Sequence, residues 1–367
     1  MIWDPRRSGK TTLLQKYKDK LNVPIFNFNT ISDRELFLPK RESLEKIARE
    51  NKVILVDEVQ YSPESTVALK ILYDEFDVKI IATGSSELRQ KSKDFDSLAG
   101  RYFELYCLPL SIEEVMLSSK VKSYSEESFL SESYVNMQVF GAYPELQSAS
   151  GLSDAKKIDM LEKIIEAYVL KDIVNIYKLK NIKLARDILL KIALQLGSEV
   201  SIREIASSFQ ANIATVSSYI EIFIKNYVLI PLYPFKTNLR RAVSENRKLY
   251  FMDIGVRNAL VNDFRPISLR PDKGGLFENL VISELEKTSK NHGLKINKYF
   301  YREYGGKEVD LVIEDYRKNY WVFEIKSKRG YGGDIFPIQN KYSNINSENF
   351  YQELVRLMDS IKASMNK

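Results

Sequence analysis

The chain has very few of the residues that build disulfides and most zinc sites. Its 367 residues include one cysteine, Cys107, and one histidine, His292. A disulfide framework within the chain is therefore excluded, and zinc sites made of Cys and His need more of these residues than the chain has. Any metal chemistry has to use oxygen ligands, which favours magnesium or manganese.

Long apolar runs and a secretory signal are also lacking. The longest uncharged apolar stretch is a handful of residues, well short of the roughly 20 that a membrane-spanning helix needs. The N-terminus reads MIWDPRRSGK and has no charged region followed by an apolar one. We therefore expect no membrane segment and a cytoplasmic protein.

Length and charge set only broad limits. At 367 residues, the chain is too long for one ordinary domain, so several domains are expected. The formal net charge is +6, and because mildly basic surfaces are common, this value alone indicates no partner. Where the basic residues gather along the chain is more informative.

A phosphate-binding loop is predicted at the N-terminus. Residues 4–11 read DPRRSGKT and lead directly into the helical pattern TLLQKYKDKL. Gly9 would let the backbone approach a phosphate, and the helix start would direct N–H groups and its dipole at the anion. Lys10 would reach the outer phosphates of ATP, and Thr11 would bind magnesium through its hydroxyl. The remaining predicted contacts with ATP come from Arg7, Ser8 and Thr12.

An acidic strand end supplies the second half of this predicted site. Residues 53–60 read VILVDEVQ, four apolar β-formers followed by two acids, which is typical of a strand buried on both faces of a parallel sheet. Asp57 and Glu58 would then lie at the carboxyl edge of the sheet, where such sheets bind ligands. Asp57 would hold magnesium, and Glu58 would activate the attacking water. An ordinary acidic strand end is the alternative.

Two further positions are candidates for the nucleotide site. The strand pattern at 78–86, VKIIATGSS, places Thr83 or Ser85 where a hydroxyl would sense the γ-phosphate, although these residues also suit a turn. Arg101 follows a glycine and would enter a neighbouring subunit's phosphate site as an arginine finger, which implies a homo-oligomer. A salt-bridged surface arginine is the equal alternative.

The middle of the chain is predicted to be helical and then to form a helix-turn-helix. The apolar spacing over 111–195 is helical and favours a lid and connector. In the segment 199–235, Ser201 is expected to cap a short helix and Thr215 to start a second one, followed by a strand.

The segment after this strand is predicted to be the wing of a DNA-binding winged helix. It reads KTNLRRAVSENRKLYFMD, with a polar tip and an apolar return. Its positive charge would suit DNA phosphates. A winged helix that contacts only protein is the alternative. The predicted contacts are Lys236, Arg240, Arg241, Arg247 and Lys248.

A metal-carboxylate pattern is predicted near the C-terminus. Asp310, thirteen residues, and then Glu324-X-Lys326 match the active-site signature of restriction-endonuclease-like nucleases. The two carboxylates would bind magnesium and Lys326 would polarise the water, while Glu278, on a preceding helix, would add a ligand or base. A binding module that keeps these residues without cutting is the alternative.

Several segments carry a resemblance over almost the whole chain. They read PRRSGKTTLL, VILVDEVQ, ATGSSE with a later AGR, LPLSIEEV, GAYPE, KLYFMDIGVRNAL and GGLFENLVISEL. In this order they resemble archaeal and bacterial AAA-type ATPases that have a C-terminal domain of uncharacterised function. Two features depart from the group: Asp4 replaces the first glycine of the loop, and the strand before it is reduced to residues 1–3. Either the natural start lies upstream or nucleotide binding is weakened.

Together these observations predict an α/β chain that has a P-loop NTPase parallel sheet. The expected function is that of an ATP-binding and ATP-hydrolysing protein that uses Mg²⁺ and acts on or near DNA. The alternative is a nucleotide-dependent switch that binds DNA or a partner protein and has no cleavage activity. The expected parts are a P-loop ATPase core at 1–110, a helical lid and connector at 111–195, a winged helix at 196–255 and a restriction-endonuclease-like domain at 256–367.

Overall fold

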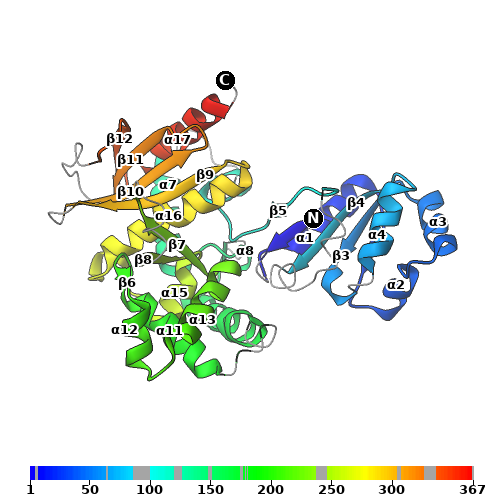
Figure 1. Cartoon of the computed structure of the whole chain (residues 1–367), viewed down its shortest axis with the longest axis horizontal. Helices are drawn as coiled ribbons and strands as arrows, with labels where there is room; N and C mark the ends of the chain where they lie inside the picture. Colours follow the sequence, from blue (N-terminus) through cyan, green and yellow to red (C-terminus); the bar gives the residue numbers. More distant parts are fainter. Residues whose placement is uncertain are drawn as a thin grey trace. The chain divides into compact units, whose positions relative to one another are not determined.

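The chain divides into two compact units, Met1–Leu108 and Pro109–Lys367, in a computed structural model (Figure 1). None of the described helices is long and apolar enough to cross a membrane. The structure describes residues 1–4, 7–62, 65–85, 100–119, 126–147, 151–173, 177, 179, 181–236, 246–303, 307–325 and 336–365.

Unit 1 is built on a parallel sheet, as the sequence predicted. Its described residues form a five-stranded sheet in the order β2-β3-β4-β1-β5, and neighbouring strands pair in parallel. Strand β4 therefore lies between β1, which leads into the phosphate loop, and β3, which ends at Asp57. The strands are β1 (Ile2–Asp4), β2 (Ile25–Asn27), β3 (Val53–Asp57), β4 (Lys79–Ser85) and β5 (Leu105–Tyr106).

Helices pack around this sheet and bury its apolar residues. The predicted strand in VILVDEVQ is β3, and Ile54, Leu55 and Val56 are fully buried. Strand β1 has only three residues, but Trp3 in it is also fully buried in the core of unit 1. The helices are α1 (Lys10–Leu21), α2 (Ile31–Leu36), α3 (Arg41–Glu50) and α4 (Ser65–Asp74), with a 3₁₀ turn at Val59–Tyr61.

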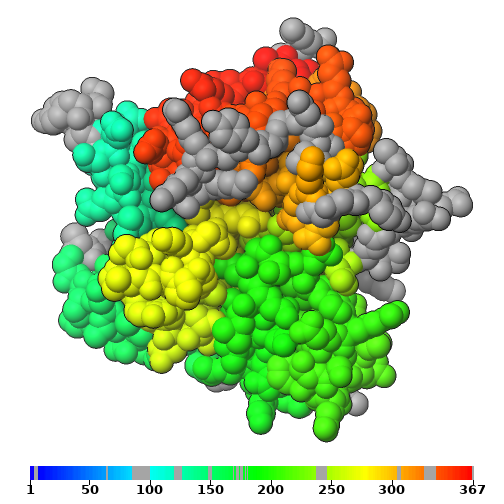
Figure 2. All heavy atoms as spheres, turned by 90° about the vertical axis from the view of Figure 1, so that its left-hand side faces the viewer, coloured from blue at the N-terminus to red at the C-terminus, as the bar shows by residue number. Residues whose placement is uncertain are grey.

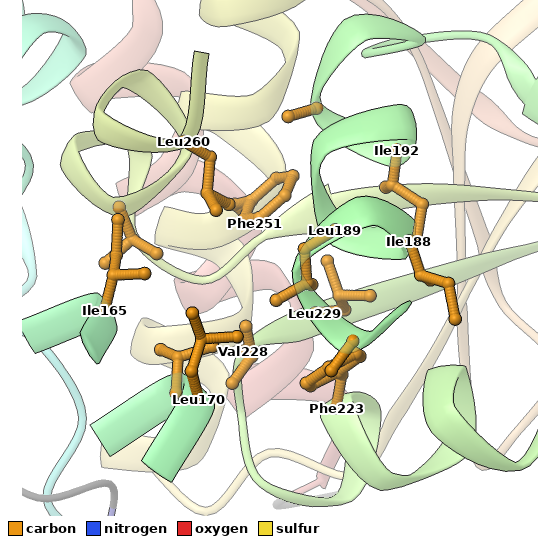
Figure 3. Packing of buried hydrophobic residues seen from close by; sticks show 14 of the residues in the cluster. Ile165, Leu170, Ile188, Leu189, Ile192, Phe223, Val228, Leu229, Phe251 and Leu260 are labelled. Carbon is orange, nitrogen blue, oxygen red and sulfur yellow. The ribbon is translucent and has the colours of Figure 1, made fainter. Parts of the chain in front are cut away.

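Unit 2 begins with helices, which agrees with the periodicity over 111–195. From the end of α7 to α11, their apolar residues form one core together with the helices and strands that follow (Figure 3). The helices before residue 195 are α6 (Ile112–Ser119), α7 (Glu126–Phe140), α8 (Pro144–Gln147), α9 (Asp154–Ile164), the π-helix η4 (Ile165–Asp172) and α11 (Ile182–Leu194). Side chains that meet in this core include Ile165, Leu170, Ile188, Leu189, Ile192, Phe223, Val228, Leu229, Phe251 and Leu260.

The predicted pair of helices is present as α12 (Ile202–Ser208) and α13 (Ile213–Lys225). Ser201 caps α12 as expected, because its hydroxyl accepts a hydrogen bond from the backbone N–H of Glu204 at 3.3 Å. The predicted start of α13 at Thr215 was wrong by two residues. Asn212 is the cap, since its side-chain oxygen accepts from Ala214 N at 2.8 Å and fixes the first turn there.

One sheet joins the strands around the predicted wing to those of the C-terminal part. The described residues of unit 2 form a seven-stranded sheet in the order β12-β11-β10-β9-β7-β8-β6. The junction is the parallel pair of β7 and β9, in which Tyr233 lies beside Tyr299 and Pro234 beside Phe300. The strands are β6 (Glu199–Val200), β7 (Leu229–Pro234), β8 (Arg247–Phe251), β9 (Ile296–Arg302), β10 (Glu308–Asp315), β11 (Tyr320–Ile325) and β12 (Lys341–Ile345).

The remaining helices of unit 2 follow β8. Figure 2 shows this unit with α11 to α13 in green at one end and the C-terminal strands and α17 in orange to red at the other. The shared sheet contains strands from both sides of the predicted domain boundary at residues 255 and 256. The predicted winged helix and the predicted C-terminal domain therefore lie within one compact unit. These helices are α15 (Ile254–Val261), the 3₁₀ turn η5 (Ile267–Leu269), α16 (Lys273–Asn291) and α17 (Phe350–Met365).

Candidate functional site

The predicted phosphate loop leads directly into helix α1. Gly9 is the N-cap of α1 and has a left-handed backbone, with φ 102° and ψ 12°, which glycine adopts without strain. The Cys107 thiol donates to the carbonyl of Ser8 at 3.2 Å and so ties the loop to the end of β5. Ser8 and Lys10 are buried, whereas Arg7, Thr11 and Thr12 are exposed. The start of α1 thus has the conformation that phosphate binding requires.

Asp57 joins the helix and both strands at the carboxyl edge of the sheet. Its Oδ2 accepts a hydrogen bond from the Thr11 hydroxyl at 3.0 Å, and its Oδ1 accepts one from the hydroxyl of Thr83. Thr83 is fully buried on β4 and in turn accepts from the backbone N–H of Glu58 at 3.3 Å. The residues predicted to hold magnesium are therefore in contact, and their hydroxyl and carboxylate oxygens are the ligands that Mg²⁺ prefers.

Glu58 follows Asp57 in a strained backbone conformation. Its φ of 60° and ψ of 46° are left-handed, which is uncommon for a residue other than glycine. Its carboxylate accepts a hydrogen bond from the amide of Gln60. Ser85 is the last residue of β4, but the side chains of Ser85 and Asp4 lie outside the described part of the structure.

A carboxylate of helix α16 lies at the centre of a second polar cluster, in unit 2. Glu278 Oε1 lies 3.2 Å from Lys248 Nζ and accepts a hydrogen bond from the Tyr250 hydroxyl. Lys248 also pairs with Glu308 at the start of β10. Burial lowers the pKa of Lys248, but the charges of Glu278 and Glu308 more than offset this and raise it above its ordinary value. We call Lys248, Glu278, Glu308 and Asp310 the carboxylate cluster.

Asp310 is electrostatically coupled to this cluster. Its pKa is raised to about 6, first by burial and then by the negative charge of Glu278. A β-bulge interrupts the register of β10 between Val309 and Val312, and such bulges re-aim side chains. The carboxylate of Asp310 accepts a hydrogen bond from the backbone N–H of Ile325 at 2.7 Å, which places it at the end of β11.

The other predicted metal ligand, Glu324, lies on β11 and is buried. Its carboxylate accepts a hydrogen bond from the Tyr342 hydroxyl at 3.0 Å. Lys326 lies outside the described residues. Within the described ranges no group of three His, Cys, Asp or Glu side chains is arranged to hold a metal ion. The roles predicted for Asp310, Glu324 and Lys326 therefore stay predictions.

Comparison with known families assigns only the first unit. Residues 1–116 match the family model described as "AAA domain". Unit 1 contains an AAA-type P-loop domain. Residues 131–266 and 273–335 match models described as domains of unknown function, DUF8612 and DUF4143.

Relatives are found in a bacterium and an archaeon. An uncharacterized protein of Haemophilus influenzae is 22% identical over 93% of this chain and 86% of its own length. One of Methanocaldococcus jannaschii is 27% identical over 85% of this chain and 71% of its own length. The Aeropyrum pernix Orc1 protein, solved in complex with DNA, matches 71% of this chain and 86% of its own at 12% identity, but its TM-score of 0.29 supports no argument.

Arg101 makes an ion pair within the AAA-type domain. Its Nε lies 2.9 Å from Asp74 Oδ2 at the end of α4, and each side chain is about one-third exposed. This is the salt bridge that the sequence left open as an alternative. An arginine finger acts on a neighbouring subunit, so that role stays a prediction.

Two of the predicted wing residues are not on the surface, which corrects the sequence analysis. Arg247 is 8% exposed and lies 2.7 Å from Glu221 of α13, while Lys248 is 3% exposed within the carboxylate cluster. Every residue of β8 is buried because β6 and β7 flank it. Neither cation is therefore available to a DNA phosphate. Lys236 is partly buried, and Arg240 and Arg241 lie outside the described residues.

Sequence reasoning missed Tyr250 and Glu308 as members of a polar site. A signal was present for Tyr250, because residues two apart on a strand share a face. Lys248 and Tyr250 are two apart on β8 and both contact Glu278. Their shared target on α16 could be found only from the packing of that helix on the sheet.

Proposed function

We propose that the chain is an ATP-hydrolysing protein of the AAA type that acts on or near DNA. The observation that carries the proposal is the contact of Asp57 with both Thr11 and Thr83, beside the Gly9 turn. It gathers a helix N-terminus, a hydroxyl and a carboxylate at the carboxyl edge of a parallel sheet. Phosphates of ATP would bind at that helix start, with Mg²⁺ held by Thr11 and Asp57.

Hydrolysis would depend on Glu58. Its backbone N–H is anchored on Thr83, which also holds Asp57, so the metal ligand and the proposed base are positioned by one buried hydroxyl. Mg²⁺ would neutralise charge on the transferred phosphoryl group, and Glu58 would orient the water and accept its proton. Ser85 ends β4, the strand between β1 and β3, and would sense the γ-phosphate.

Action on DNA is supported by the order of elements from α11 to β8. A helix, a short strand, two further helices and two antiparallel strands follow one another, which is the arrangement of a winged helix. The first turn of α13 is exposed at Ile213 and Thr215, and recognition helices read bases with their N-terminal residues. Arg240 and Arg241, between β7 and β8, would contact phosphates.

The test is phosphate release by the full chain at saturating ATP and Mg²⁺, with and without a short duplex. Turnover that the duplex stimulates supports the proposal. Turnover that the duplex leaves unchanged removes the DNA role, and no turnover above that of Glu58→Gln removes the ATPase role.

A nucleotide-dependent switch without cleavage is the second candidate. It is favoured by the Lys248 ammonium, which already contacts Glu278, the residue expected to serve a nuclease as ligand or base. Supercoiled plasmid incubated with Mg²⁺ or Mn²⁺, with and without ATP, separates the candidates. Cutting that Asp310→Ala abolishes would establish the nuclease, whereas intact plasmid under all conditions favours the switch.

A further inference from the structure

The chain enters unit 2 through the segment LPLSIEEV, residues 108–115, and buried charged side chains hold this segment in place. Glu284 and Lys287 of α16 are both buried and form an ion pair at 2.8 Å. The Glu284 carboxylate accepts a hydrogen bond from the backbone N–H of Ile112 at 2.7 Å. Lys287 Nζ donates to the carbonyl of Leu110 at 3.1 Å. Each member of the ion pair therefore also binds the backbone of the segment.

A third buried charge, Asp253, holds the same segment through one further backbone group. The N–H of Leu110 donates to the carbonyl of Ala142 at 2.8 Å, and the N–H of Ala142 donates to the Asp253 carboxylate at 2.7 Å. Only glycine fits before Ala142, because a Cβ on Gly141 would lie 2.0 Å from Asp253 Oδ1. We call the three charged side chains that hold this backbone the connector clasp: Asp253, Glu284 and Lys287.

Four segments that are far apart in the sequence meet at the connector clasp. They read LPLSIEEV, GAYPE, KLYFMDIGVRNAL and GGLFENLVISEL. Burying charged groups is costly, and replacing a buried ion pair by apolar side chains often leaves stability unchanged or higher. Stability alone is therefore a weak reason for the clasp. Its hydrogen bonds end on the backbone around Leu110, which indicates that it positions this backbone.

Three residues before Leu110, the chain is bound to the predicted phosphate loop of unit 1. The backbone N–H of Cys107 donates to the carbonyl of Trp3 at 2.9 Å, and its thiol donates to the carbonyl of Ser8 at 3.2 Å. Only residues 108–109 separate Cys107 from Leu110, and the second of them is a proline. Two residues span at most about 7 Å, and proline fixes its own φ angle. A displacement of the loop at Ser8 therefore has a short and stiff path to Leu110.

The connector clasp is also continuous with the strands around the predicted wing. Asp253 comes two residues after the end of β8. Asn279 of α16 binds both backbone groups of Phe251, the last residue of β8: its side-chain oxygen accepts from the N–H at 2.8 Å, and its amide donates to the carbonyl at 2.7 Å. The helix that carries Glu284 and Lys287 is thus bound to the strand that returns from the wing.

We propose that the connector clasp couples the two ligands of the chain: ATP at the phosphate loop changes the affinity of unit 2 for duplex DNA, through Cys107 and the backbone that Glu284 and Lys287 hold. The inference rests on the proposed function, since it takes ATP as the ligand of unit 1 and DNA as the ligand of unit 2. Such coupling is reciprocal, so the duplex changes the affinity for ATP by the same factor.

The test is calorimetry of the full chain with a non-hydrolysable ATP analogue and Mg²⁺, with and without a saturating short duplex. In the parent, the duplex should change the dissociation constant of the analogue by about fivefold or more. Insertion of Gly-Ser-Gly-Ser between Leu108 and Pro109 leaves the phosphate loop and the clasp intact but makes the path between them long and flexible. This variant should bind each ligand alone as the parent does, and the duplex should no longer change the dissociation constant of the analogue.

A second variant tests the clasp itself. Glu284→Leu with Lys287→Met removes both charges together, so that neither is left buried and unpaired. It should also lose the effect of the duplex on the analogue, because Leu110 and Ile112 are no longer held by α16. The matched control is Glu45→Gln with Arg49→Met, which neutralises an ion pair on the surface of α3 and should keep the coupling of the parent. If circular dichroism shows that the clasp variant does not fold, the insertion variant alone decides.

Two results overturn the proposal while the proposed function stands. In the first, the parent binds the analogue and the duplex without either changing the affinity for the other. In the second, the insertion variant keeps the full coupling of the parent. Failure of the proposed function is seen earlier, in titrations with one ligand, because the parent would then bind no analogue or no duplex. The coupling, which needs both ligands, is overturned with it.

Discussion

At the scale of single residues, the candidate nucleotide site depends on a few polar contacts that position otherwise ordinary side chains. Thr83 is fully buried, and its hydroxyl forms hydrogen bonds with both the Asp57 carboxylate and the backbone N–H of Glu58. The sequence offered Thr83 as a candidate sensor of the γ-phosphate. In the structure its hydroxyl also orients Asp57, the predicted metal ligand.

Loss of Lys10 should abolish nucleotide binding, and loss of the Glu58 carboxylate should abolish turnover alone. Lys10→Ala removes the cation expected at the outer phosphates. Glu58→Gln keeps the shape but removes the base, and we expect turnover to fall by about 10²-fold or more. Calorimetry with a non-hydrolysable ATP analogue measures binding, and phosphate release measures turnover.

Lys16→Ala is the matched control for Lys10→Ala, because Lys16 is exposed on the same helix, α1. It should leave both measurements unchanged. Unaltered binding in Lys10→Ala or unaltered turnover in Glu58→Gln would show that the assigned site is wrong.

The raised pKa of Asp310 should make stability depend on pH. Its pKa is about 6 in the folded chain against an ordinary 3.8, so between these values the folded state holds more protons than the unfolded state. The free energy of unfolding should therefore fall as pH rises through this range. Asp310→Asn carries no such proton, and it should gain stability relative to the parent between about pH 4 and about pH 7.

The measurement is urea unfolding of both proteins across this range with a chelator present, so that no metal ion interferes. A difference between Asp310→Asn and the parent that is constant with pH would show that Asp310 is not held in the protonated form by its surroundings.

At the scale of elements, the short strand β1 is held by its neighbours. It pairs with β4 on one side and β5 on the other, and Trp3 lies beside Gly84 of β4. The sequence indicated that this strand is reduced, yet its three residues place Trp3 in the core and lead directly to the loop before Gly9. The position of the phosphate loop thus depends on this close approach of the two strands.

Gly84→Ala should destabilise unit 1. A Cβ at this position would lie 2.7 Å from Cζ3 of the Trp3 ring and 3.1 Å from Val59, and the ring is fully buried. We expect a loss of about 1–3 kcal/mol, which is typical of overpacking in a core. Thermal unfolding followed by tryptophan fluorescence measures the effect.

Gly274→Ala is the control substitution. Gly274 lies in helix α16, and a Cβ added there would meet no atom within 4 Å, so alanine should be neutral or stabilise by about 0.5–1 kcal/mol. Equal unfolding temperatures for Gly84→Ala and the parent would mean that β1 and β4 do not pack as described.

At the scale of the whole chain, we assign ATP hydrolysis to unit 1 and contact with DNA to unit 2. The AAA-type domain would bind the nucleotide. Unit 2 has the helix pair α12 and α13 and one continuous sheet, whose strands β8 and β10 carry Lys248, Glu308 and Asp310 of the carboxylate cluster. Because β7 and β9 pair directly, the proposed DNA-reading part and the nuclease-like part form one body. A change in one of them is expected to reach the other through that sheet.

Neutralising the wing should weaken binding to duplex DNA. Arg240→Ala with Arg241→Ala removes two proposed phosphate contacts, so affinity should fall for all sequences and the salt slope should decrease by about 1 per contact. Fluorescence anisotropy with a labelled duplex at several salt concentrations gives both values. Lys156→Ala, an exposed lysine on α9, should change neither. A salt slope identical to the parent's would remove the wing as a DNA contact.

The amino-acid sequence by itself determined the features that depend on residues near one another in the chain. The glycine and lysine before α1, the apolar run of β3 that ends in acids, and the Ser201 cap could be predicted because each is a local preference of the backbone. The same local rules placed the start of α13 two residues late, at Thr215, because the Asn212 side chain caps the helix and begins it at Ile213.

Only the tertiary structure decided which basic residues are buried and how far the second unit extends. Arg247 and Lys248 look like surface charge in the sequence, but β8 lies between β6 and β7, and carboxylates from α13, α16 and β10 meet their side chains. The pairing of β7 with β9 likewise joins segments that are far apart in sequence. Such pairings are set by burial and hydrogen bonding between distant strands, which no local pattern of residues specifies.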